Sequence, residues 1–148
     1  MALSVAAGTE TLHGYSFGLL DGTQDLIFGA QHHIYTVLSI IAFCRAIGAA
    51  TDTATIQILG NNNHITGTAQ TMKIANYVCV ANETFVFNDK FSFNGFETAA
   101  YTEPLDDNAK QLLQAAQGSA VPQRLQMTTT DADVDLDVHV TFIDQNNA

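Results

Sequence analysis

The stretch DADVDLDVHVTF, residues 131–142, constrains the fold of this chain more than any other segment. Aspartate occupies every second position from Asp131 to Asp137, and apolar residues fill the positions between and beyond. Because successive side chains of a β-strand point to opposite sides, this period of two predicts a strand with one buried face and one hydrated face. A slip of one residue would turn the aspartates inward at a large cost, so the register of the strand is strongly determined.

The same four carboxylates are the candidate metal ligands of the sequence: Asp131, Asp133, Asp135 and Asp137. Neighbouring carboxylates on one strand face lie ~6.7 Å apart and repel each other by roughly 0.6 kcal/mol in water, which a hydrated face tolerates. Calcium sites usually gather their oxygen ligands from a curved loop with a glycine turn, whereas these four lie on a line. We therefore expect a solvated face, with a calcium site as the alternative, and no cofactor.

The length and charge of the chain limit the classes of protein to which it can belong. The chain has 148 residues, which suits one domain with a substantial core. Fifteen acidic residues against five basic ones give a net charge of −10, yet only 14% of residues are charged, against ~25% in typical soluble domains. The acidity argues against binding to a nucleic-acid backbone, which requires clusters of lysine and arginine. The low charge density indicates a largely neutral surface that a partner could cover.

The N-terminal region differs in character from the rest of the chain. The segment MALSVAAGTETLHG has no positive leader and no long apolar run, so we expect no signal peptide, no transmembrane span and synthesis in the cytoplasm. Residues 1–23 show no sustained hydrophobic period and are predicted to form an extended N-terminal arm. Residues 24–148 are predicted to form the folded domain.

Turn-forming residues divide that domain into short strands. The expected strands are 25–28, 33–47 as one bent strand or two, 53–59, three within 73–95, one within 123–130, and the aspartate strand. Phe85 and Phe87 are predicted to face Phe91 and Phe93 across a hairpin turn. The fold class is therefore all-β, an antiparallel β-sandwich of about seven to nine strands.

One segment interrupts the strand pattern. Over residues 102–118 apolar residues recur at helical spacing, with Pro104 suited to the start and Gly118 to the end. We predict one inserted short helix there. Residues 60–67, GNNNHITG, are predicted to form a loop, because asparagine and glycine accept left-handed backbone geometry at low cost.

Motifs of catalysis are weak throughout the sequence. No G-x-S-x-G, P-loop, G-x-G-x-x-G or H-E-x-x-H motif occurs. His32 and His33 are adjacent, so on a strand they would face opposite sides and could not share one ion. We expect surface positions for both, with a turn that brings them to one ion as the alternative. His139 extends the aspartate face beyond Asp137; a surface residue is favoured there, with a ligand pair or an ion pair as the alternatives. His13 and His64 fall in the expected arm and loop. We expect no catalytic residues and no enzyme activity.

The two cysteines carry little chemical signal. Cys44 and Cys79 lie in apolar strand-like runs and lack C-x-x-C spacing, so we expect two reduced, buried thiols. Asn82-Glu83-Thr84 fits a glycosylation sequon, but a polar turn before the next strand is the simpler interpretation.

A family resemblance rests on four segments: IYTV, SIIAFCRAIGAATDTATIQIL, YVCVANETFVFNDKFSFNGFE and the closing VDLDVHVTFID. In this order of strands and turns, over roughly residues 24–98 and 122–145, the chain resembles small β-sandwich virion proteins of tailed bacteriophages. These are head decoration (cement) proteins and related minor structural proteins. The inserted segment at 102–118 and the long N-terminal region depart from the family's pattern.

The resemblance implies a non-enzymatic virion structural protein that binds the outer surface of the major capsid protein lattice. It also implies homotrimers on that lattice, assembly from protein made in the bacterial host cytoplasm, and no nucleic-acid or membrane partner. Two alternatives stay open. A phage tail, neck, receptor-binding or carbohydrate-binding β-sandwich module would suit the same fold, and a hydrolase has the least support.

Overall fold

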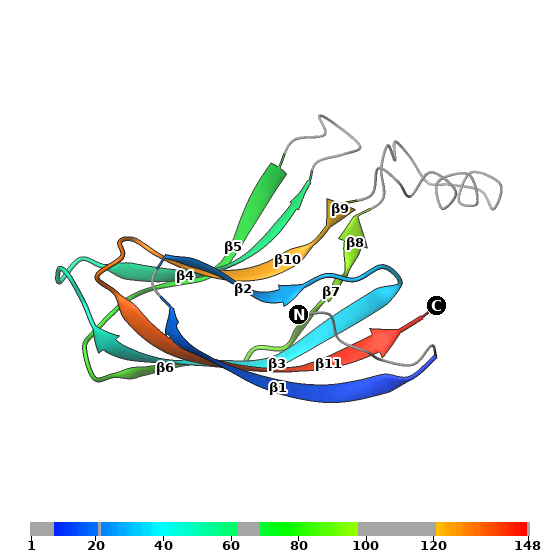
Figure 1. The fold of residues 1–148 in the computed structure, drawn as a ribbon, viewed down its shortest axis with the longest axis horizontal. Helices are drawn as coiled ribbons and strands as arrows, with labels where there is room; N and C mark the ends of the chain where they lie inside the picture. The colour runs from blue at the N-terminus through cyan, green and yellow to red at the C-terminus, as the bar shows by residue number, and fades with distance from the viewer. Residues whose placement is uncertain (1–7, 21, 62–68, 98–120, 148) are drawn as a thin grey trace.

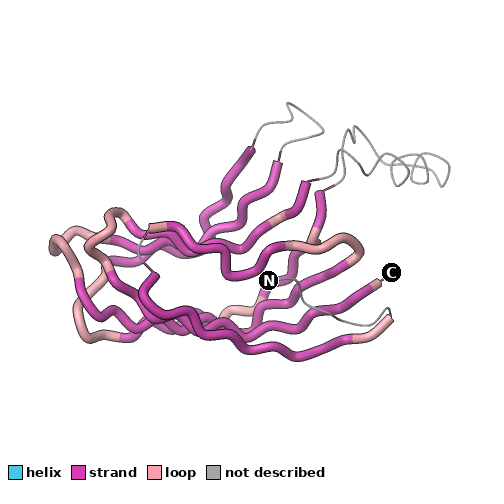
Figure 2. The backbone as a smooth tube through the Cα atoms, viewed as in Figure 1, coloured by secondary structure: helices cyan, strands magenta, loops and turns pink. Residues whose placement is uncertain are grey.

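A computed structural model describes residues 8–20, 22–61, 69–97 and 121–147, and within them the chain forms strands joined by turns, with no helix (Figure 2). The strands are β1 (Glu10–Leu20), β2 (Thr23–Phe28), β3 (His33–Ala46), β4 (Thr53–Asn61), β5 (Ala69–Val78), β6 (Thr84–Phe87), β7 (Phe91–Asn94), β8 (Phe96–Glu97), β9 (Val121–Pro122), β10 (Arg124–Thr129) and β11 (Asp135–Asn146).

The strands form two layers that face each other (Figure 1). Sheet A has five strands in the order β1-β11-β3-β6, with β7 also paired to β3, and sheet B has four in the order β2-β10-β4-β5. β8 and β9 form a separate two-stranded ladder. All strand pairs are antiparallel, so the predicted all-β class with two antiparallel sheets is confirmed.

The chain crosses repeatedly between the layers. β1 lies in sheet A, β2 in sheet B, β3 in sheet A, β4 and β5 in sheet B, β6 and β7 in sheet A, β10 in sheet B and β11 in sheet A. If β6 and β7 count as one interrupted edge strand, two sheets of four strands result. This is the connectivity of a jelly roll, in which each sheet interleaves strands from the two halves of the chain.

The core lies between the sheets and draws on both. Sheet A contributes Tyr35, Ile40 and Phe142, and sheet B contributes Ile56 and Met127, all of them buried. Fully burying one side chain of this size stabilises the fold by ~1.5–3 kcal/mol. The alternation on β11 that the sequence predicts is present, because every second residue from Leu136 to Phe142 is buried.

β3 is a single strand of 14 residues, which confirms the bent-strand alternative over two strands. Its register against β11 shifts between Val37 and Ser39, so Leu38 has no partner in β11. Such a bulge explains why Val37 and Ile40 are both buried although they are three residues apart, since an unbroken strand would turn one of them outward.

The hairpin expected between Phe85–Phe87 and Phe91–Phe93 does not form. β6 pairs with residues 40–43 of β3 and β7 pairs with residues 34–37, both antiparallel, so the two short strands run in the same direction. Residues 88–90 therefore interrupt an edge strand instead of reversing the chain. The aromatic residues still meet, because the Phe87 and Phe91 rings lie 6.1 Å apart between centroids.

The arm expected over residues 1–23 also needs correction. Residues 10–20 form β1, the edge strand of sheet A, and pair with β11 from Gln145 to Leu136. The reason is visible in the alternation: Tyr15 and Phe17 pack against the core, while Ser16 between them is exposed. The glycines at 14 and 18 fall on the outward face and masked this period in the sequence.

Two glycines allow a close crossing of strands at one end of the sandwich. The Gly29 N–H donates to the Gln123 carbonyl at 2.9 Å, and the Gln123 N–H donates to the Gly95 carbonyl at 2.8 Å. A Cβ added at Gly29 or Gly95 would collide with backbone atoms of the neighbouring segment. Only glycine allows the backbones to approach this closely.

The helix expected at 102–118 lies outside the described residues, as do residues 62–67 of the loop expected at 60–67, with His64. Gly60 and Asn61 of that expected loop belong to β4 instead.

Candidate functional site

Sheet A carries an apolar patch on its outer face, formed by Ile41, Phe43 and Val86 and called here the sheet A patch. The residues between Ile41 and Phe43 and on either side of them point into the core, so these two side chains point outward. Val86 is the cross-strand partner of Ile41 on β6. Their exposed fractions are 38% for Ile41, 36% for Phe43 and 53% for Val86. The three side chains therefore form one contiguous exposed surface.

Polar and acidic groups adjoin the sheet A patch on β11. Asp137 is the partner of Phe43, and His139 is the partner of Ile41. The Arg45 Nε donates to Asp137 Oδ2 at 2.9 Å, and both side chains are nearly half exposed. His139 Nδ1 lies 2.8 Å from Ser16 Oγ on β1, so His139 is a surface residue with a local partner, as favoured from the sequence.

The four aspartates do not lie on one strand. β11 begins at Asp135, and Asp131 and Asp133 lie in the turn before it, where the Asp133 N–H donates to Asp131 Oδ1 at 2.8 Å. The alternation that predicted one long strand continues through this turn because Val134 is also buried. Among the residues that the structure describes, no three His, Cys, Asp or Glu side chains gather in a way that could hold a metal ion.

Asp52 fixes the turn that faces those aspartates. Its Oδ2 accepts hydrogen bonds from the N–H groups of Gly48 and Ala49 at 2.8 and 2.7 Å. The hydrogen bond from the Ala49 N–H is the largest factor that lowers the pKa of the Asp52 carboxyl. This carboxylate is structural, since it ties the β3–β4 turn to the start of β4.

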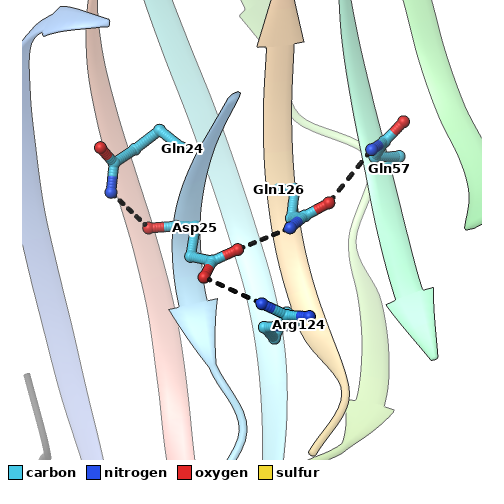
Figure 3. A network of polar contacts seen from close by, with 5 residues as sticks. All are labelled: Gln24, Asp25, Gln57, Arg124 and Gln126. Carbon is cyan, nitrogen blue, oxygen red and sulfur yellow. Dashed lines mark hydrogen bonds and ion pairs between the residues drawn. The ribbon is translucent and has the colours of Figure 1, made fainter. Parts of the chain in front are cut away.

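Sheet B has an outer face of a different kind, where amide, carboxylate and guanidinium groups contact one another (Figure 3). Asp25 on β2 accepts from the Gln126 Nε2 at 2.7 Å, and the Gln126 Oε1 accepts from Gln57 Nε2 on β4 at 3.1 Å. Arg124 Nη1 lies 3.5 Å from the second Asp25 oxygen, and its guanidinium covers the Phe28 ring at 5.5 Å. These groups hydrogen-bond one another across three strands.

Other polar side chains on the outer face of sheet B also hydrogen-bond one another. Thr23 and Thr128 hydroxyls lie 2.8 Å apart, and Asn76 Nδ2 donates to Thr55 Oγ1 at 2.9 Å. Because these polar groups hydrogen-bond one another, they form a hydrated surface with few unsatisfied hydrogen-bonding groups.

A cleft of about 600 Å³ opens between the edge strands of the two sheets, β1 and β2. Aromatic side chains from both sheets line it: Tyr15, Phe17, Phe28, Tyr35 and Phe142. The opposite edge of the sandwich is closed, because the Tyr77 ring of β5 stacks on the Phe85 ring of β6 at 3.9 Å. The Ala30 N–H donates to the Tyr35 hydroxyl at 2.9 Å, and burial raises the pKa of Tyr35 to about 12.

A buried polar pair lies beside Tyr35, whose ring lines the cleft and lies 6.0 Å from the His33 ring. His33 Nδ1 and Asp144 Oδ1 are 2.6 Å apart, and their side chains are 9% and 0% exposed. The surface position predicted for His33 is therefore wrong, and Asp144 was not predicted from the sequence. The sequence does contain a signal for Asp144. It lies two residues after Phe142, so the alternation of β11 places both side chains on the core face.

The remaining predicted residues are placed as follows. His13 lies on the core side of β1 and stacks on Tyr15 at 5.9 Å, so it is not part of a free arm. His32 lies in the β2–β3 turn at a positive φ of 65°. Asn82 also has a positive φ and precedes β6, which confirms the predicted polar turn at 82–84.

Cys44 and Cys79 are free and buried, as predicted. Burial raises the pKa of Cys79 to about 11 and also raises the pKa of Cys44.

Comparisons with known proteins identify no family. No protein-family model matches the sequence, and no curated protein matches it. Solved structures give distant likenesses. One is a chain of the infectious bursal disease virus particle, with 10% identity over 98% of this chain and 33% of that chain, at a TM-score of 0.47. This chain thus spans about a third of that viral chain.

Two further likenesses cover most of both chains. One belongs to the capsid structure of Helicobacter pylori bacteriophage KHP30, with 11% identity over 93% of this chain and 90% of that chain, at a TM-score of 0.39. The other is the C-terminal family 22 carbohydrate-binding module of a Clostridium thermocellum xylanase, with 11% identity over 95% and 87%, at a TM-score of 0.45. At these TM-scores and identities, the likenesses establish neither a family nor a function.

Within the described ranges, no helix is long and apolar enough to span a membrane.

Proposed function

We propose that this chain is a non-enzymatic structural protein of a bacteriophage virion, a head decoration (cement) protein that binds the outer surface of the major capsid protein lattice. The observation that carries the proposal is the contrast between the two outer faces of the sandwich. Sheet A exposes a contiguous apolar patch. On the outer face of sheet B the exposed side chains of Phe28 and Val78 lie at opposite ends, and the rows between them carry amides and hydroxyls that hydrogen-bond one another. A sandwich with one adhesive face and one hydrated face suits a protein that coats another surface.

The sequence resemblance to phage decoration proteins supports the same proposal. A net charge of −10 keeps such a coat soluble and disfavours binding to nucleic acid. We further propose that the protein is made in the bacterial host cytoplasm and acts on the capsid as a homotrimer. Many identical weak contacts on a lattice then act together through avidity.

Purified particles of the phage that encodes this chain provide the test. Cryo-electron microscopy is expected to show the sandwich on the outer capsid surface, around threefold or quasi-threefold positions. Density at the neck or tail alone would replace the decoration role by the tail-module alternative. A chain that sits singly and away from any symmetry axis would refute the trimer.

The cleft favours a second candidate function, a carbohydrate- or receptor-binding β-sandwich module. Its volume and aromatic lining are those of a small-molecule site. A glycan array distinguishes the two functions: specific binding that Tyr15→Ala abolishes would support the module, and no binding would leave the decoration role.

The non-enzymatic part of the proposal has its own test. Ser16 and His139 lie 2.8 Å apart on the exposed face of sheet A, while the nearby Asp137 carboxylate binds Arg45. A broad screen with esterase and glycosidase substrates is expected to show no turnover. Turnover that Ser16→Ala abolishes would establish a hydrolase instead.

A further inference from the structure

We propose that the sheet A patch and the acidic groups beside it form the docking surface of this chain, and that the partner surface has an apolar centre and a rim of lysine and arginine. The proposal rests on the proposed function, in which that partner is the capsid lattice. It adds which face of the sandwich binds and what chemistry it recognises.

The geometry of the sheet A patch is that of an interface centre. Ile41 and Val86 are paired across β3 and β6, and Phe43 lies two residues along the same outward face. The corresponding rows on the outer face of sheet B hold hydroxyls and amides, such as Thr55 and Asn76. Exposed apolar side chains that touch one another and are bordered by polar residues are typical of protein-protein interfaces.

The charges beside the patch favour one kind of partner. Asp135 and Asp137 carry carboxylates along β11 beside the patch, and Asp137 is the cross-strand partner of Phe43. Arg45 is the cation among these groups, and its Nε is engaged by Asp137. The surround of the patch is therefore negative.

The turn that precedes β11 extends this negative surround. Asp131 and Asp133 are exposed and lie against Gly48, beyond the end of β3. On the side of β11 and the turn before it, the surround thus consists of four carboxylates and one paired cation.

Charge complementarity indicates which kind of partner binds the sheet A patch. A second copy of the chain would bring the same carboxylates to the interface, and like charges juxtaposed at an interface oppose association. A surface with apolar residues flanked by lysine and arginine would satisfy both features at once. Such binding weakens as salt screens the ion pairs, because the Debye length falls from ~10 Å at 0.1 M to ~3 Å at 1 M.

The experiment measures binding of the purified protein to particles of the encoding phage assembled without it. The test variants are Ile41→Thr and Val86→Thr, and the matched control is Val78→Thr on sheet B. Val78 is 56% exposed and Val86 is 53% exposed, so Val78→Thr and Val86→Thr each replace a similarly exposed strand valine by another β-branched residue. Circular dichroism confirms that each variant is folded.

A loss of about tenfold in affinity for the double variant I41T/V86T, with the control within about twofold of the original protein, would support the surface. Affinity that falls steadily with added salt, with a shallower slope for Asp135→Asn than for Glu10→Gln at the far end of β1, would support the basic partner.

Each contrary result overturns a separate part of the account. If the original protein binds and I41T/V86T binds as well as V78T, the docking surface is wrong and the proposed function stands. Salt-independent binding would overturn the basic rim. If V86T instead abolishes self-association in solution while binding to particles is unchanged, the occupant is a second copy. If the original protein does not bind at all, the proposed function fails, and the docking proposal fails with it.

Discussion

Replacing Asp144 by alanine is expected to destabilise the protein far more than replacing any exposed aspartate. Asp144 is fully buried, and its Oδ1 lies 2.6 Å from His33 Nδ1. The substitution leaves the nearly buried His33 ring nitrogen without this partner. A buried polar group deprived of its hydrogen bond costs ~1–3 kcal/mol, and a buried charge costs more.

In a chain of this length, each kcal/mol lowers Tm by roughly 2–4 °C, so D144A is expected to lower Tm by several degrees. Urea denaturation supplies the free energy of unfolding. Because the chain has no tryptophan, far-UV circular dichroism and tyrosine fluorescence are the suitable signals. The m-value checks that the unfolded state is unchanged.

Asp137→Ala is the matched control. Asp137 lies on the same strand and also pairs with a basic side chain, but that pair is nearly half exposed. Exposed pairs contribute only ~0–1 kcal/mol. The double variant H33F/D144L removes both polar partners and is expected to recover part of the loss. If D144A and D137A lose equal stability, the buried pair does not have the role assigned to it.

Four further predictions follow from other parts of the fold. Removal of residues 1–7 should leave the sandwich folded, whereas removal of residues 1–20 takes away edge strand β1 and should abolish cooperative unfolding. If the variant without residues 1–20 still unfolds cooperatively, the prediction of an extended arm is supported. Because the Asp52 pKa is lowered by the Ala49 N–H, its contribution is present above the ordinary carboxyl pKa of 3.8 and lost as pH falls. Asp52→Asn should thus be less stable than the original protein at pH 7, with the gap closing in acid; a pH-independent gap contradicts this. Cys44 and Cys79 should resist a thiol reagent at pH 8 until the protein is denatured, because both are buried and have raised pKa values; rapid modification of the folded protein would be inconsistent with this packing. Melts with excess EDTA and excess calcium should coincide, and a rise of many degrees with calcium would establish a metal site.

The sequence predicts the strands better than it predicts their pairing. Alternation on β11 and the apolar run on β3 identify both strands, because burial of one face dictates the period. The non-hairpin arrangement of β6 and β7 depends on both pairing with β3, a contact far along the chain that no local pattern encodes. β1 was missed because Gly14 and Gly18 occupy its outward face, where glycine normally indicates a turn.

The candidate surfaces show the same limit. The aspartate row was found but was placed on one strand, since the turn at 131–133 happens to continue the alternation. The sheet A patch could not be derived, because Ile41 and Val86 become neighbours only through the pairing of β3 with β6. The cleft requires two edge strands, β1 and β2, that belong to different sheets.

Quantitative mass spectrometry of purified particles tests the central claim most directly. The measurement compares the molar amount of this chain with that of the major capsid protein in the same preparation. Head decoration predicts hundreds of copies per particle, retained after repeated washing at low salt. A few copies per particle would indicate a neck or tail position, and absence of the chain from washed particles would contradict a virion role altogether.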